Sequence, residues 1–140
     1  MRIGQLAPLA ESVPPKLYGG TERVVAWLVD ELVDLGHDVT LFASGDSKTS
    51  AKLLPCCETA LRVNPSVKDP LLYHIIMLEE VRQRIDQFDV LHFHIDILQA
   101  PLIRDIADRT VTTPARAIGF ARPHSVLRNV SGAPSRLGLK

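Results

Sequence analysis

The spacing of apolar residues predicts a long helix near the N-terminus. Between residues 21 and 35, apolar side chains recur three and four positions apart, which places them on one face of a helix. They are Val24, Val25, Leu28, Val29, Leu32 and Leu35. Gly20 or Thr21 can cap the start of this helix, and Gly36 can end it in the left-handed backbone conformation. We therefore expect a helix over residues 21–35, with Trp27 also in the core.

The same pattern predicts a second long helix over residues 70–87 and a shorter one over residues 100–107. The apolar side of the longer helix would carry Leu71, Leu72, Ile75, Ile76, Leu78 and Ile85, with Met77 in the core. Residues 8–20 hold three prolines and two glycines, too many for a helix. We expect this segment to be a long connection.

Short apolar runs at residues 2–7, 38–43, 89–95 and 110–113 predict four strands. Helices of the predicted length between strands imply parallel pairing through right-handed crossovers. The pattern therefore predicts an α/β fold, a Rossmann-like doubly wound parallel sheet.

Composition suits one globular domain and excludes several classes of protein. The chain has 140 residues, of which 46% are hydrophobic and 23% charged, and its formal net charge is zero. A neutral balance does not indicate a nucleic-acid partner, and no run reaches the roughly 18 apolar residues that span a bilayer. The N-terminal residues lack the apolar core of a signal peptide, and the only cysteines, Cys56 and Cys57, are adjacent and fit no zinc pattern. We expect a cytoplasmic protein without a transmembrane segment.

Charge divides the chain after residue 113. Residues 114–140 contain four arginines, one lysine and no Asp or Glu, so this segment carries +5 and residues 1–113 carry −5. The segment is also rich in Pro, Gly, Ala and Ser and has no amphipathic period. The sequence therefore predicts an α/β domain over residues 1–113 and a separate basic tail over residues 114–140.

Two glycines precede the first predicted helix, in the order Tyr18, Gly19, Gly20, Thr21 and Glu22. In doubly wound sheets, ligands collect at the carboxyl ends of the strands, where such loops lie. Glycines let backbone N–H groups approach an anion at a helix N-terminus. The spacing is neither that of a dinucleotide fingerprint nor that of a P-loop. A flexible turn with a helix cap explains the same residues, and both interpretations stay open.

His92 and His94 end the third predicted strand, on one face of it because side chains alternate along a strand. Such a pair can hydrogen-bond a substrate, shuttle a proton, bind a metal or play a structural role. A metal needs further ligands, and no second cluster of His, Asp or Cys has ligand spacing. We predict substrate contact, with structural histidines as the alternative.

Residues 44–47, Ser-Gly-Asp-Ser, close the second predicted strand. In a Rossmann-like sheet an acidic residue at this place can contact a ribose, which would be the role of Asp46. An ordinary turn explains the same residues.

Several segments combine into a pattern that is more specific than any single motif. They are MRIGQLAP, PPKLYGGTERVV, ELVDLGHDVTLFASGDS, FDVLHFHIDILQAPL and TVTT. In this order and spacing they closely resemble the N-terminal half of family 4 retaining glycosyltransferases, over residues 1–113. The resemblance implies a B-type glycosyltransferase fold, in which two Rossmann-like domains face each other across a cleft.

The resemblance implies transfer of a sugar, with retention, from a nucleotide-sugar donor to an acceptor. It places the glycine loop near the donor's diphosphate and implies that His94 faces the cleft near a reacting sugar, as the catalytic residue. The donor- and acceptor-binding residues that follow are Lys16, Gly19, Gly20, Thr21 and His92. It implies no bound metal or other cofactor, because helix N-termini and basic side chains can neutralise the leaving diphosphate.

The chain departs from the family pattern after Thr113. The resemblance leads us to expect a His-Gly pair, whereas the chain continues with Pro114, Ala115 and Arg116. The family's C-terminal domain, which binds most of the nucleotide sugar, is missing from this sequence. We therefore expect a truncated fragment that is inactive alone, and we leave peripheral membrane contact open.

A shifted reading frame accounts for the departure. Suitable codons for residues 114–123, read one nucleotide later, can spell Leu-His-Gly-Arg-Leu-Asp-Leu-Pro-Asp-Leu, which the resemblance places after TVTT. We therefore expect residues 114–140 to be a frameshifted or disordered remnant. The competing hypothesis is a stand-alone α/β binding module whose basic tail contacts an acidic partner or RNA. A metal-dependent hydrolase that uses the two histidines ranks third.

Overall fold

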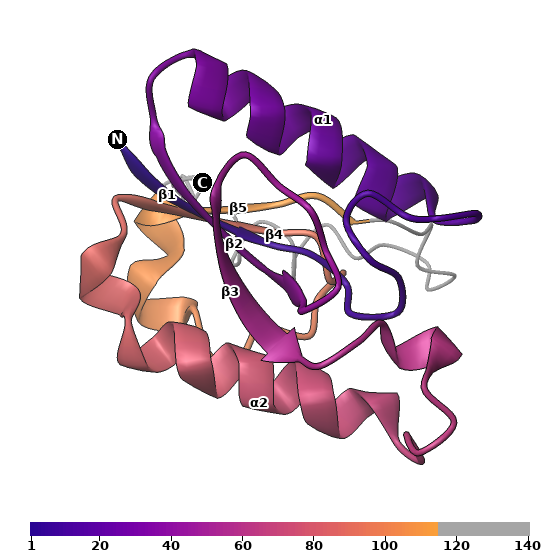
Figure 1. Cartoon of the computed structure of the whole chain (residues 1–140). Coiled ribbons are helices and arrows are strands. Elements are labelled where there is room, and N and C mark those ends of the chain that lie inside the picture. Colours follow the sequence, from indigo (N-terminus) through magenta and orange to yellow (C-terminus); the bar gives the residue numbers. More distant parts are fainter. Residues whose placement is uncertain (115–140) are drawn as a thin grey trace, which may run out of the picture.

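The computed structural model describes residues 1–114, which form one sheet of five parallel strands. The strands are β1 (Arg2–Leu6), β2 (Asp38–Ser44), β3 (Lys52–Cys57), β4 (Val90–Phe93) and β5 (Thr110–Thr112). Two α-helices, α1 (Gly20–Asp34) and α2 (Pro70–Gln83), and the 3-10 helices η1 (Leu61–Val63), η2 (Ile85–Gln87) and η3 (Arg104–Arg109) connect them. Figure 1 shows the sheet between α1 and α2. The α/β fold expected from the sequence is confirmed.

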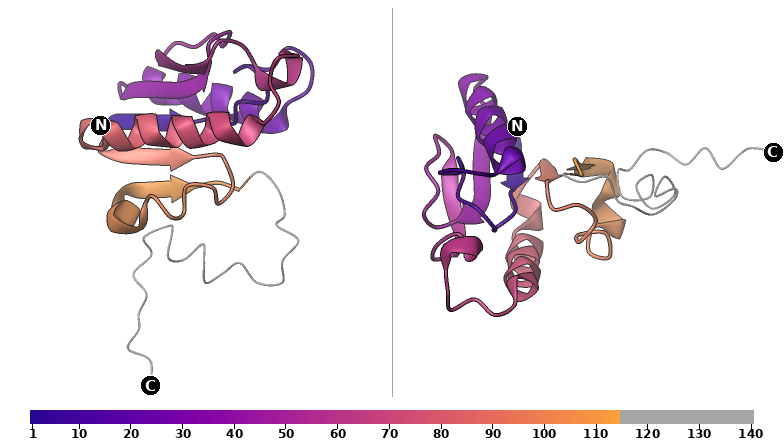
Figure 2. Two further views of the ribbon diagram at one scale, coloured as in Figure 1. Left: turned by 90° about the horizontal axis from the view of Figure 1, so that it is seen from below. Right: turned by 90° about the vertical axis from the view of Figure 1, so that its right-hand side faces the viewer.

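The strand order is β3-β2-β1-β4-β5, and each neighbouring pair is parallel. The left view of Figure 2 shows this order, from β3 at one edge to β5 at the other. The chain moves outward from β1 to β3 and then crosses back to place β4 on the other side of β1. Strand order therefore reverses between β1 and β4, the place where doubly wound sheets bind ligands.

Helix α1 covers one face of the sheet through Val25 and Val29, which are fully buried. These side chains belong to a core cluster with Ile3, Val39 and Leu41 from β1 and β2. A fully buried side chain of this size contributes about 1.5–3 kcal/mol to folding. The predicted helix over residues 21–35 is thus confirmed, and its apolar stripe is held against the sheet.

Helix α2 covers the opposite face through Met77 and Val81, which are also fully buried. They pack in a second cluster with Leu6, Phe42 and Phe93. The rings of Phe42 and Phe88 meet edge to face with their centroids 5.7 Å apart. Helices on both faces make the sheet doubly wound, as the sequence predicts.

Several residues expected on the buried helix faces lie in solvent instead. They are Val24 and Trp27 in α1, Leu35 directly after it, and Leu71, Leu72, Ile75 and Ile76 in α2. The first half of α2 is apolar on nearly all sides, so the spacing alone does not identify the face that packs. The structure corrects the buried set of α2 to Met77, Leu78 and Val81.

Strand β3 was not predicted from the sequence, and two of the predicted helices differ from the structure. The strand lies at the sheet edge and contains Pro55, which lacks the N–H that an interior strand needs. The helix expected over residues 70–87 ends at Gln83 and is followed by η2. Turns followed by η3 replace the helix expected over residues 100–107.

No helix within residues 1–114 combines the length and the hydropathy needed to cross a bilayer. The expectations for a frameshifted or partner-binding tail concern residues that, apart from Pro114, lie outside the described part of the chain.

Candidate functional site

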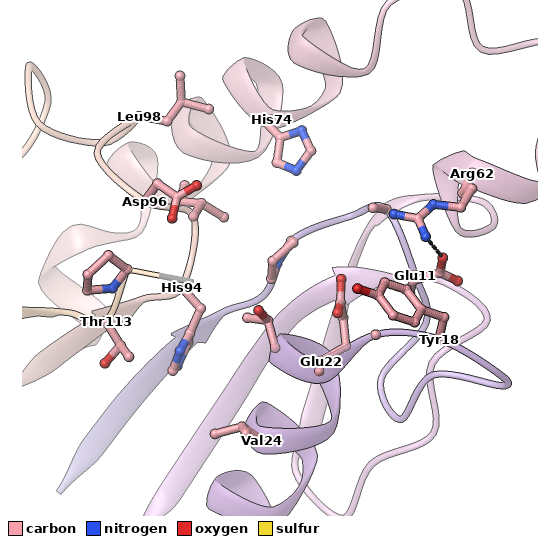
Figure 3. A pocket seen from close by; sticks show the side chains of 17 residues that line it. Glu11, Tyr18, Glu22, Val24, Arg62, His74, His94, Asp96, Leu98 and Thr113 are labelled. Atoms are coloured by element: carbon pink, nitrogen blue, oxygen red, sulfur yellow. Dashed lines mark ion pairs between the residues drawn. The ribbon is translucent and has the colours of Figure 1, made fainter. Parts of the chain in front are cut away.

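A pocket of about 750 Å³ lies beside the reversal of strand order, beyond the carboxyl ends of β1 and β4. Figure 3 shows how separate parts of the chain meet around it. The loop after β1 supplies Glu11, the start of α1 supplies Gly20, and the segment after β4 supplies His94. Arg62 from η1 and His74 from α2 complete its wall. The pocket therefore stands where the fold predicts a ligand site.

The start of α1 opens into this pocket. Its N-cap residue is Gly19, and no side chain caps the helix. The first N–H groups of a helix have no helical partner and give that end a partial positive charge. A Cβ atom on Gly20 would meet nothing within 4 Å. The backbone at Gly20 is exposed and is thus open to an approaching ligand.

Gly19 has a different reason to be glycine. Its φ of +152° is one that side chains rarely adopt, and a Cβ atom here would lie 2.8 Å from the Cβ atom of Pro15. The glycine pair therefore combines a backbone turn at Gly19 with access at Gly20. Both features fit the anion-binding interpretation of the sequence motif.

A charged cluster forms the wall next to this helix start. Arg62 forms an ion pair with Glu11, with 2.9 Å between the nitrogen and oxygen atoms. The guanidinium carbon of Arg62 lies 5.9 Å from the centre of the Tyr18 ring. Glu22, in the first turn of α1, is 5% exposed, and burial raises the pKa of its carboxyl group above its usual value. The negative charge of Glu11 raises this pKa further, whereas Arg62 lowers it.

His92 and His94 lie side by side, as the strand period predicts. Their ring centroids are 4.0 Å apart. His94 lines the pocket, while His92 bonds to Thr113 Oγ1 at 2.8 Å. Burial lowers the pKa of His92, and it lowers the pKa of His94 to about 3, with a further contribution from His92. Both rings are therefore neutral at pH 7.

His74, from the first turns of α2, has partners on both ring nitrogens. Its Nδ1–H donates to the carbonyl oxygen of Pro70 at 2.9 Å, and its Nε2 accepts from the N–H of Leu9 at 3.1 Å. This histidine ties α2 to the loop after β1. Its contribution to the pocket wall is structural.

Asp96 is the second polar residue that the end of β4 brings to the pocket. Its φ is +60°, in the left-handed region that residues other than glycine seldom occupy. Such conformations cost about 1–3 kcal/mol and cluster at functional sites. Strain at Asp96 is thus a further feature typical of a ligand site.

The structure brings four of the sequence-predicted site residues into the pocket wall: Gly19, Gly20, Thr21 and His94. His92 lies next to His94, outside the lining. Lys16 is exposed and does not line the pocket. In the part of the chain that the structure describes, no group of three or more His, Cys, Asp or Glu could hold a metal ion.

The turn after β2 has the contacts of a structural turn. The Asp46 carboxylate accepts from the N–H of Ala60 at 3.0 Å, and the Ser47 hydroxyl accepts from the N–H of Val13 at 2.9 Å. A Cβ atom on Gly45 would lie 2.7 Å from the carbonyl oxygen of Glu58. These contacts support the ordinary-turn interpretation of residues 44–47.

Sequence reasoning missed the charged wall and the partner of the histidines. Glu11 and Arg62 are 51 positions apart, and no local pattern pairs them. Gln5, which bonds to both His92 and His94, leaves a signal in the sequence: it is a polar residue inside a buried strand. A buried polar side chain needs partners, so Gln5 could have pointed to the histidines.

A parallel α/β domain with a pocket at its strand reversal, and a helix start that opens into it, defines the Rossmann-like class of ligand-binding domains. The family follows from the sequence: residues 18–114 match the family model described as Glycosyltransferase Family 4. The match extends over more than half of the 140 residues, and the chain belongs to this family.

Comparison with solved structures found AviGT4, a glycosyltransferase involved in avilamycin A biosynthesis. The sequences are 28% identical, and the TM-score is 0.43. The alignment covers 66% of this chain and 25% of AviGT4, so the chain spans about a quarter of that protein's length. A search of curated proteins gave no significant match.

Proposed function

We propose that residues 1–113 form the N-terminal domain of a retaining glycosyltransferase, which moves a hexose from a nucleotide sugar to an acceptor. Membership of Glycosyltransferase Family 4 supports the transferase class. The observation that carries the proposal is the uncapped start of α1, which opens into the pocket at the strand reversal. A helix start of this kind suits the diphosphate of a nucleotide sugar.

The chemistry requires that negative charge be stabilised as it develops. The bond between the anomeric carbon and the diphosphate oxygen breaks, and a bond to the acceptor oxygen forms. The acceptor's proton leaves with a phosphate oxygen, and the diphosphate departs as an anion. Fixed N–H donors stabilise such an anion because they need no reorganisation during the reaction. We assign this role to the backbone of Gly19, Gly20 and Thr21.

The remaining site residues take roles near the sugars. His94, buried in the pocket wall, would contact the reacting sugar as the catalytic residue, and His92 would support donor or acceptor binding. Lys16 is exposed two positions before the pocket residue Tyr18, and its ammonium group would add positive charge for the diphosphate. The chain would need no bound metal or other cofactor.

We further propose that the chain alone does not catalyse transfer. The family resemblance implies a second domain that binds most of the nucleotide sugar, so residues 1–113 would hold the donor weakly. The complete enzyme would act in the cytoplasm, with a nucleotide sugar and an acceptor as its partners.

The test measures binding and transfer with a panel of nucleotide sugars. Calorimetry of the purified chain should detect weak binding of at least one donor, and product analysis should detect no transfer. Gly20→Val should abolish binding, because a branched side chain blocks the approach of phosphate to the backbone. The structure leaves room for the new side chain, so folding should persist.

A matched control places the same side chain at the start of the other helix. Pro70 is the first residue of α2, is exposed and does not line the pocket, so Pro70→Val should leave donor binding unchanged. Equal loss of binding in both variants, or no binding of any donor, would contradict the donor site. Sustained transfer by the 140-residue chain would contradict the need for a second domain.

A further inference from the structure

Gln5 is a polar residue in β1 that lies between the apolar residues Ile3 and Ala7 on one side of the strand, and it is 1% exposed. The strand register places it directly beside His92. Its amide bonds to both histidines at the end of β4. The Gln5 amide therefore influences which ring nitrogens of the two histidines carry a proton.

The three side chains form a hydrogen-bond chain with one direction. His94 Nε2–H donates to the Gln5 amide oxygen at 2.8 Å. The Gln5 amide N–H then donates to His92 Nδ1 at 3.3 Å, and His92 Nε2–H donates to Thr113 Oγ1 at 2.8 Å. Because an amide has an oxygen that only accepts and a nitrogen that only donates, this order fixes the tautomer of each ring.

The direction of these hydrogen bonds determines what the His94 ring can offer to a ligand. In His94 the proton is on Nε2, so Nδ1 keeps its lone pair and can only accept a hydrogen bond. A ligand hydroxyl can donate to such a nitrogen, whereas a phosphate oxygen without a proton has nothing to donate. Since His94 lines the pocket, a ligand that reaches Nδ1 would meet an acceptor.

We propose that Gln5 is a positioning residue that holds His94 neutral, with its proton on Nε2, so that this wall of the pocket binds a ligand hydroxyl and not an anion. The hydroxyl part rests on the proposed function, in which His94 meets a sugar. The burial that lowers the pKa of His94 to about 3 acts in the same direction.

The other polar side chains around the pocket are consistent with a histidine wall that binds hydroxyls and a helix start that binds an anion. His74 uses both nitrogens for backbone groups, so it offers no free donor. Arg62 is the only Lys or Arg among the described residues of the lining, and it is paired with Glu11. Glu22 adds a carboxyl group. Glu11, Glu22 and Asp96 also line the pocket, so any attraction for an anion comes from the backbone N–H groups at the start of α1 and not from net charge, while the histidine wall suits sugar hydroxyls.

The test observes the ring nitrogens of the full 140-residue chain directly. Long-range ¹H–¹⁵N correlation spectra distinguish protonated from unprotonated ring nitrogens. For His94 we expect one protonated nitrogen, Nε2, and one unprotonated nitrogen, Nδ1, from about pH 5 to pH 8. A His94 that titrates within this range, or carries its proton on Nδ1, would overturn the proposal.

Two substitutions of Gln5 separate the electrostatic role from packing. Gln5→Glu keeps the shape but places a carboxylate between the rings, and it should raise the pKa of both histidines by about 1–3. Gln5→Leu removes the acceptor of His94 Nε2–H, and a mixture of His94 tautomers should appear. Unchanged His94 signals in folded Gln5→Leu would overturn the positioning role.

The control is Gln99→Glu, because Gln99 is a second fully buried glutamine. Its amide donates to the carbonyl oxygen of Asp96 and to Thr112 Oγ1, and neither of these bonds involves a histidine ring. This variant should leave the titration of His92 and His94 as in the parent chain. An equal rise of the histidine pKa values in both glutamate variants would contradict a specific role for Gln5.

Thr113→Val provides a test should the Gln5 variants fail to fold, since Thr113 is exposed. Loss of its hydroxyl removes the partner of His92 Nε2–H, and the change should reach His94 through the Gln5 amide. A tautomer change confined to His92 would overturn the hydrogen-bond chain.

Inorganic pyrophosphate separates this proposal from the proposed function. Its addition should shift the amide signals of Gly20 and Thr21 while His94 stays neutral. Protonation of His94 on addition would overturn the inference drawn here. No change at Gly20 and Thr21, with an unchanged His94 tautomer, would count against the donor site alone.

Discussion

The two α-helices begin in opposite ways. At the start of α2 the Asp69 carboxylate accepts from the N–H of Leu71 at 3.0 Å, and Pro70 has no N–H to satisfy. At the start of α1, Gly19 and Gly20 provide neither a side-chain acceptor nor a proline. The start of α2 is thus capped by a side chain, whereas the start of α1 has no side-chain N-cap and opens into the pocket.

Of these two helix starts, that of α1 lines the pocket, whereas α2 reaches the pocket through His74, after its own start. A side-chain N-cap stabilises a helix by about 0.5–2 kcal/mol, and α1 lacks this stabilisation. A helix start without a cap, at the strand reversal, is the arrangement that anion-binding domains use. We therefore propose that the less stabilised helix start is the functional one.

Gly19→Ala should produce the largest loss of stability at these two helix starts. The new methyl group would meet Pro15 at 2.8 Å in a backbone conformation that alanine avoids. Strain and overpacking together should lower the free energy of unfolding by about 3 kcal/mol. Urea denaturation of both chains measures the difference.

Gly36→Ala is the control, because Gly36 also has a positive φ, of +89°, but its added Cβ atom would meet nothing within 4 Å. This variant should lose only the conformational part, about 1 kcal/mol. Equal losses at Gly19 and Gly36 would show that the contact with Pro15 contributes nothing.

Acid should weaken the pocket wall through His94. The pKa of this residue is about 3 in the folded chain, against an ordinary value of about 6.5 when unfolded. Below pH 6.5 the unfolded chain therefore binds more protons, and stability falls as pH falls. The His94 contribution should decrease by about 2 kcal/mol between pH 6.5 and pH 5.

Urea denaturation at these two pH values compares the parent chain with His94→Gln, which lacks the titrating ring. The variant should lose less stability on acidification. An equal pH dependence in both chains would mean that His94 is not held neutral by the fold.

Asp69→Ala should have the smallest effect of the three on stability. It removes the cap of α2, and the free energy of unfolding should fall by about 1 kcal/mol. Since Asp69 does not line the pocket, ligand binding should not change. Loss of pyrophosphate binding in a folded Asp69→Ala chain, measured by calorimetry, would contradict the separation of the two helix starts.

Much of the fold follows from local sequence, and the exceptions have physical causes. Val25 and Val29 are four positions apart, which places them on one face of a helix, so the buried face of α1 is encoded locally. Leu71 to Leu78 is almost wholly apolar, and only contact with the sheet decides that Met77 is buried and Ile76 is not. Strand β3 escaped notice because an edge strand tolerates Pro55.

The candidate site also contains residues that local sequence predicts and residues that it does not. The glycine pair and the two histidines are predictable because each is a compact motif at an element boundary. The Glu11–Arg62 pair arises from tertiary packing, which brings distant loops together. Lys16 is close to the glycine loop in sequence, yet it is exposed and does not line the pocket. Residues that are close in sequence can therefore share a loop without sharing the pocket wall.

The most direct test of the central claim is a map of backbone amide shifts as pyrophosphate is added to the chain. We expect the largest changes on Gly20 and Thr21 at the start of α1 and no response of Leu71 at the start of α2. Gly20→Val should abolish the response. Changes centred on Leu71, or an unaltered response in Gly20→Val, would contradict the assignment of the uncapped helix start as the binding site.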